Sequence, residues 1–120
     1  MSLDIYLTRE RKISYTDGTD TITEDEPVYD TNITHNLGTM AKAVGIYKAL
    51  WRPEELDIDT AGDLIPLLEL GLHVLKEAPE YYKQYNAENG WGLYKHFVPF
   101  VENYLIACKQ YPQSKIAVSR

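Results

Sequence analysis

Residues 94–108 read YKHFVPFVENYLIAC, and their apolar members recur with the period of an α-helix. The spacing i, i+3, i+4, i+7 holds for four turns and predicts a helix with one apolar stripe. Pro112 follows and predicts its end, because proline lacks the N–H that would continue the helix. The stripe consists of Tyr94, Phe97, Val98, Val101, Tyr104, Leu105 and Cys108.

Both ends of the chain carry strand patterns that this helix could cover. Residues 3–7 alternate apolar and polar side chains, which is typical of a half-buried strand. Residues 116–118 read as a short final strand that could pair with the first. We therefore expect an α+β fold, with three to four helices packed on a small antiparallel sheet formed by the N-terminal strand or hairpin and the C-terminal strand.

The middle of the chain predicts the other helices. Thr34 can cap a helix over 35–44, and Gly45 can end it. A short helical turn is expected over 46–51, followed by a helix from Asp59 or Thr60 to about residue 78. Pro66 then either kinks that helix or lies in its first turn. Pro79 predicts the start of a short helix over 80–85.

The net charge of −6 lies in one segment. Residues 13–34 contain six acids and no Lys or Arg, and Asp17-Gly18 within them is a hairpin turn signal. Residues 9–12 read as a basic break before that hairpin, and Pro27 restricts any strand there to a sheet edge. We interpret 1–120 as a single globular domain with an acidic hairpin or loop at about 11–31.

Composition narrows the class of function. An acidic segment repels phosphate backbones, which argues against nucleic acid as a partner. The single cysteine, Cys108, excludes an intrachain disulfide and fits a reducing, cytoplasmic compartment. No signal peptide is evident, and the most apolar stretch is too short to span a bilayer, so no membrane is expected.

No constellation of residues indicates catalysis or a metal site. His35, His73 and His96 fall on different expected elements, and Glu69 with His73 matches local helix pairing as well as ligation. Cys108 lies on the apolar stripe, where a cysteine behaves as a small hydrophobic residue. We expect neither an enzyme nor a cofactor.

Two surfaces remain as binding candidates. One is the acidic segment with its flanking aromatics, which could bind a basic groove on a larger protein; the alternative is a solvated hairpin. The other is a possible ligand site near a helix N-terminus, where the alternative is simple capping. The first set is Tyr15, Asp17, Asp20, Glu24, Asp25, Glu26, Tyr29 and Asp30, and the second is Asn32, His35, Asn36, Arg52 and Trp91. The tyrosine-rich stretch with Tyr81, Tyr82 and Tyr85 is a further possible interface.

Three stretches resemble a family of small, mostly uncharacterised phage and prophage proteins. They read NITHNLGTMA at 32–41, GIYKALWRPEE at 45–55 and NGWGLY at 89–94. Within that family the chain looks like the anti-defence proteins of Bacillus phages that inhibit a defence-associated sirtuin, an NAD-depleting enzyme of the bacterial host. The resemblance implies inhibition of that host enzyme by protein–protein contact in the host cytoplasm. A small-molecule or nucleotide-signal binding protein and a minor structural phage protein are the alternatives.

Overall fold

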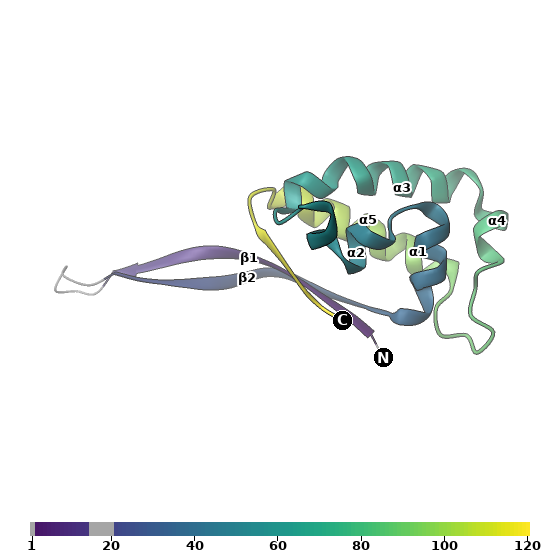
Figure 1. Cartoon of the computed structure of the whole chain (residues 1–120), viewed down its shortest axis with the longest axis horizontal. Coiled ribbons are helices and arrows are strands. Elements are labelled where there is room, and N and C mark those ends of the chain that lie inside the picture. Colours follow the sequence, from purple (N-terminus) through teal and green to yellow (C-terminus); the bar gives the residue numbers. More distant parts are fainter. Residues whose placement is uncertain (1, 15–20) are drawn as a thin grey trace.

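The computed structural model describes residues 2–14 and 21–120 and has an α+β fold (Figure 1). Within these residues there are five α-helices rather than the three to four expected. Gly45, at a φ of 88°, ends the first, and Ala78 separates the third from the fourth, which begins at Pro79. The elements are β1 (Ser2–Ser14), β2 (Thr21–Thr34), α1 (Gly38–Val44), α2 (Tyr47–Trp51), α3 (Ile65–Glu77), α4 (Pro79–Lys83), α5 (Tyr94–Gln110) and β3 (Lys115–Ser119), with 3-10 helices at His35–Leu37, Pro53–Leu56 and Ala61–Leu64.

The three strands form one antiparallel sheet in the order β2-β1-β3. Leu3, Ile5 and Leu7 of β1 are fully buried, and the intervening side chains are not, as the alternation predicted. β3 pairs with residues 4–8 of β1, with Ile5 opposite Val118. The expected pairing of the two chain ends is therefore confirmed, and it brings the termini together (Figure 1).

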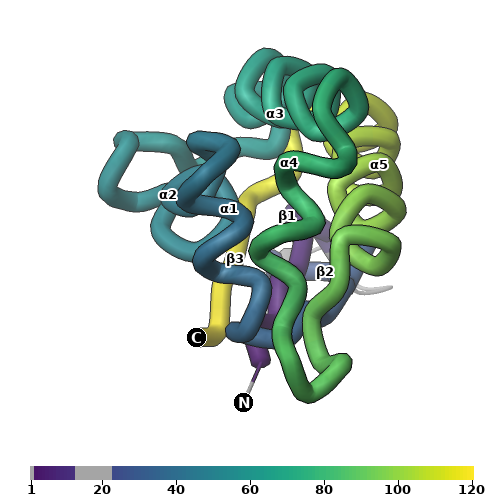
Figure 2. Tube along the Cα trace, turned by 90° about the vertical axis from the view of Figure 1, so that its right-hand side faces the viewer, coloured from purple at the N-terminus to yellow at the C-terminus, as the bar shows by residue number. Residues whose placement is uncertain are grey.

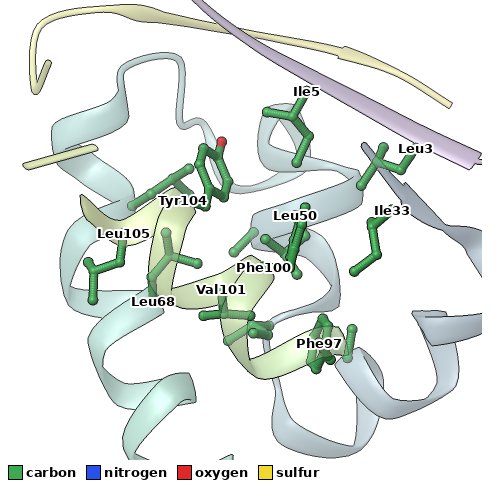
Figure 3. Close-up of a cluster of buried hydrophobic side chains, with 14 of the residues drawn as sticks. Leu3, Ile5, Ile33, Leu50, Leu68, Phe97, Phe100, Val101, Tyr104 and Leu105 are labelled. Carbon is green, nitrogen blue, oxygen red and sulfur yellow. The ribbon is translucent and has the colours of Figure 1, made fainter. Parts of the chain in front are cut away.

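The helices all lie on one face of the sheet, with α3 farthest from it (Figure 1). Figure 2 shows α1 and α2 on one side of this layer and α5 on the other. The stripe of α5 supplies much of the core: Phe97, Val101 and Tyr104 are fully buried (Figure 3). Burying such stripes is the main stabilising contribution to a domain of this size. The core thus lies between the sheet and α3, with α5 as its central element.

β1 is longer than the sequence indicated. Residues 9–12, expected as a break, continue the strand and pair with β2 as far as Ser14 opposite Thr21. The pairing shifts between Leu7 and Thr8, where Val28 is an extra residue in β2. Such a bulge bends and twists a hairpin. Pro27 lies next to it in β2, an edge strand of the sheet, as expected from its missing N–H.

Candidate functional site

The hairpin extends well beyond the body of the molecule (Figure 1). β3 pairs with β1 only as far as Thr8, so beyond that point β1 and β2 form a two-stranded ribbon. We call its described residues, 8–14 and 21–27, the arm. The side chains of residues 9–12 and 23–25 are exposed, and the molecule measures 61 × 27 × 23 Å along its principal axes. The arm therefore presents side chains and strand edges away from the core.

Basic residues of β1 offset part of the acidic charge on the arm. Arg9 Nε donates to Glu26 Oε2 at 3.0 Å, and Arg11 lies opposite Glu24. Both pairs are on the same face, because alternate residues of a strand share a face. On the other face Glu10 lies opposite Asp25, and like charges in that position repel each other. Lys12, opposite Thr23, shares this face and offsets one of the two acids. The described arm therefore keeps a net charge of −1, which lies on the face of Glu10 and Asp25.

The structure separates the residues predicted to bind a partner. Glu24 and Asp25 are exposed on the arm, whereas Asp30 is exposed on the body opposite Tyr6. Tyr29 stacks on Tyr104 with ring centroids 6.3 Å apart, and its partial burial raises the pKa of its phenol. Tyr29 is thus part of the body rather than a free aromatic anchor. Tyr15, Asp17 and Asp20 lie outside the described residues.

A pocket of about 540 Å³ lies near the opposite end of the hairpin. Its walls come from the end of β2, the turn at 89–92 and the start of α5. Three residues singled out from the sequence, Asn32, Asn36 and Trp91, line it together. We call it the Trp91 pocket. His96 also lines the pocket, and sequence reasoning missed it. Nothing in the local pattern around α5 distinguishes a histidine that lines a pocket from one that faces open solvent.

Hydrogen bonds hold the walls of the Trp91 pocket in place. Asn36 Nδ2 donates to the main-chain oxygen of Trp91 at 2.8 Å, and Asn89 Oδ1 accepts from the Trp91 N–H at 3.0 Å. Gly92, at a φ of 112°, lies so close to Asn36 that an added Cβ would be 3.0 Å from the Asn36 Cβ. Only glycine combines that backbone angle with that approach. The turn at 89–92 is therefore held against the segment around Asn36, which is distant in sequence.

The other two predicted ligand residues lie elsewhere. Trp51 Nε1 donates to His35 Nδ1 at 2.9 Å, so that histidine anchors α2. The Arg52 guanidinium pairs with Glu55 at 3.3 Å, and Trp51 stacks on Tyr47 rather than on Arg52. The capping alternative is also observed, because the Thr34 hydroxyl accepts from the Asn36 N–H at 3.3 Å.

His73 lies in a surface ion pair, and Cys108 lies in the core. His73 pairs with Glu77 rather than Glu69, whose carboxylate contacts Lys109 of α5. No group of three metal-ligating side chains occurs within the described residues. Cys108 is fully buried, and desolvation raises the pKa of its thiol from 9.0 to about 12. A thiol in that environment is a poor nucleophile, because the thiolate is the reactive form.

Comparison with protein-family models, curated proteins and solved structures found no match. Among the described residues, no helix has the length and apolarity required to cross a membrane. The arm and the Trp91 pocket are therefore the two features on which a functional interpretation can be built.

Proposed function

We propose that this protein acts by binding a larger protein through its arm and that it performs no catalysis itself. The arm carries the proposal. Its residues 9–12 and 23–25 are exposed, and no side chain at 8–12 or 23–27 belongs to the buried core. An isolated two-stranded ribbon gains little stability in water, so its length is not explained by the needs of the fold. A projection of this kind is suited to entering a groove on a partner.

The resemblance to anti-defence proteins makes a host NAD-depleting enzyme of the sirtuin type the partner to test first. Inhibition would follow from occupation of a groove that the enzyme needs for substrate access or for assembly. The face with Glu10 and Asp25, which Lys12 compensates only in part, favours a groove lined by basic residues. The pair of Arg9 with Glu26 leaves the opposite face nearly neutral, so we expect that face to contribute less to long-range attraction.

The test compares two triple variants that change net charge equally. E24Q/D25N/E26Q removes three of the four acids of the described arm, and E77Q/E80Q/E88Q removes three exposed acids of the body. Association kinetics with the immobilised host enzyme are measured over a salt series, and inhibition is measured by NAD consumption. We expect the arm variant to associate about tenfold more slowly at low salt and only about twofold more slowly at 0.5 M, because salt screens the attraction.

The body variant serves as the control and should associate nearly as fast as the wild type at each salt concentration. Circular dichroism confirms that both variants are folded. Equal rates for the arm variant and the wild type at low salt would contradict a role for the arm. The interface would then be sought on α4, where Tyr81 is 54% exposed and lies edge-on to Tyr82.

A second function, binding of a small ligand, is favoured by one observation. Asn32, Asn36 and Trp91 come from distant parts of the chain and line the same pocket. Native mass spectrometry of protein purified from infected cells separates the two functions. A retained large protein supports the first, and a retained small ligand supports the second.

A further inference from the structure

The polar side chains of the Trp91 pocket have their donor groups already occupied. Asn32 Nδ2 donates to Ser2 Oγ at 3.0 Å and also to the Asp4 carboxylate, and Asn36 Nδ2 donates to the Trp91 main-chain oxygen. A carboxylate and a carbonyl can only accept, so these partners determine which end of each amide is nitrogen. Neither amide oxygen accepts a hydrogen bond from a residue that the structure describes. Both asparagines therefore have an acceptor left for a ligand.

The charge around the pocket is suited to a cation. Lys and Arg are absent from the described residues that line it, and the Asp4 carboxylate lies beside it through Asn32. The chain as a whole carries a net charge of −6, which attracts cations to its surface. A phosphate group would find no guanidinium or ammonium partner here, because Arg52 is engaged with Glu55 outside the pocket. This arrangement disfavours a nucleotide and favours a ligand rich in N–H donors.

The indole of Trp91 adds a surface for a flat cation. Trp91 is 71% exposed, the largest exposed fraction among the large apolar side chains of the described residues. Guanidinium groups stack on indole faces, and the interaction is worth about 0.5–2 kcal/mol depending on desolvation. The buried Leu37 and Phe100 form an apolar floor below. A volume of about 540 Å³ accommodates a guanidinium on an alkyl stem.

We infer that the Trp91 pocket binds a guanidinium group, which stacks on Trp91 and donates hydrogen bonds to the amide oxygens of Asn32 and Asn36. The group could belong to a small free guanidine or to an arginine side chain of a protein. The site is independent of the arm, which lies at the other end of the hairpin (Figure 1).

Two-dimensional ¹H–¹⁵N NMR of the full chain tests this inference with three probes. The probes are N-acetyl-arginine methylamide, N-butylguanidine and N-acetyl-citrulline methylamide, which has nearly the shape of the first without its charge. The chain has two tryptophans, so its spectrum contains two indole N–H signals. We expect saturable shifts of the Trp91 signal with the two guanidines, with a dissociation constant on the order of 1 mM for ligands of this size. The buried Trp51 signal should stay in place.

Matched charge variants give the inference a predicted sign. N89D keeps the oxygen that accepts from the Trp91 N–H and adds a negative charge at the pocket wall. Q113E makes the same chemical change beyond the far end of α5. We expect N89D to bind N-acetyl-arginine methylamide about three- to tenfold more tightly, and Q113E to bind it like the wild type. W91L should bind it at least about fivefold more weakly, because the stacking surface is lost.

The outcomes distinguish the source of the guanidinium group and test whether the pocket binds a cation. Tighter binding of N-butylguanidine than of N-acetyl-arginine methylamide, which carries the same single charge, indicates a free guanidine, and the reverse order indicates an arginine side chain. Equal shifts with the citrulline probe, or no gain in N89D, would overturn the assignment of a cation. Absence of a saturable shift at about 50 mM of either guanidine would overturn the site itself. These measurements use the isolated protein, so their failure leaves the proposed role of the arm untouched.

Discussion

At the scale of single residues, Tyr104 places a polar group in the core without a hydrogen-bond partner among the described residues. Its side chain is fully buried between Tyr29, Phe100 and Cys108, and its hydroxyl makes no hydrogen bond to any described residue. A buried hydroxyl without a partner costs about 1–3 kcal/mol of desolvation. Burial accordingly raises the pKa of the Tyr104 phenol well above its ordinary value.

Replacing Tyr104 by phenylalanine should stabilise the protein. The ring and its stacking on Tyr29 are kept, and the unpaired hydroxyl is removed. We expect the free energy of unfolding to rise by about 1 kcal/mol in urea denaturation at pH 7. A loss of more than about 1 kcal/mol would instead show that the hydroxyl is hydrogen bonded, for example through a buried water.

Alkaline titration supplies a second measurement on the same variant. In the folded chain burial raises the pKa of the Cys108 thiol from 9.0 to about 12 and that of the Tyr104 phenol above 10.0. The unfolded chain therefore releases these protons at lower pH, and stability should fall as pH rises above about 9. The slope is about 1.4 kcal/mol per pH unit for each group, and Y104F should lose one such contribution above about pH 10.

At the scale of elements, the approach of α3 to the segment between α1 and α2 depends on Gly71. A Cβ built on Gly71 would lie 2.6 Å from Cγ2 and 3.2 Å from Cδ1 of Ile46, which is buried. Glycine inside a helix lowers helix propensity, so local sequence gives no reason for Gly71 at this position. Tertiary contact supplies the reason for it, because α3 could not pack this closely with a larger residue.

Replacing Gly71 by alanine should destabilise the protein although it raises helix propensity. We expect a loss of about 1–3 kcal/mol from overpacking, against a propensity gain of about 1 kcal/mol. Urea denaturation measures the difference, and L70A, at a side chain that is 63% exposed on the same helix, is the control and should change little. A more stable G71A would mean that Ile46 moves aside at no cost, contrary to tight packing.

At the scale of the whole molecule, a compact body carries a projecting arm. The body contains the buried side chains of β1, which end at Leu7, together with all five α-helices and β3. Thr8, at the base of the arm, pairs with Lys115 of β3. Beyond Thr8 the described arm is held by the ladder between β1 and β2 and by the pair of Arg9 with Glu26. Stability and the proposed partner contact are therefore located in different parts of the chain.

Shortening the arm should leave the body folded. In the variant, an Asn-Gly turn replaces residues 9–26, so that Thr8 and Pro27 remain opposite each other. We expect the free energy of unfolding to change by less than about 1 kcal/mol, because the side chains removed at 9–12 and 23–26 lie outside the buried core. Binding to the host enzyme should be lost. Unfolding of this variant would show that the arm is needed for the fold, and retained binding would move the interface to the body.

Local pattern alone predicted much of the fold and some of the candidate sites. Period-two alternation placed residues 3–7 on a half-buried strand, and the stripe on residues 94–108 placed α5 in the core. Thr34 predicted a helix cap and Gly45 predicted a helix end. Both could be predicted because these roles depend only on the residue's own backbone and its neighbours within one turn. The acidic segment was recognised from composition, but the ion pair in which Arg9 neutralises Glu26 was not predicted.

Features that depend on residues distant in sequence were decided by the tertiary structure. The sequence by itself determined which segments are strands or helices and which faces are apolar, since these follow from local periodicity and turn chemistry. It grouped Asn36 and Trp91 as candidate ligand residues, but it could not indicate which hydrogen bond joins them, or that Arg9 would face Glu26. Such long-range pairing depends on sheet register and on how the layers pack. A one-residue change of register would move every arm side chain to the opposite face. The Trp91 pocket and the charge pattern of the arm therefore exist only once the chain is folded.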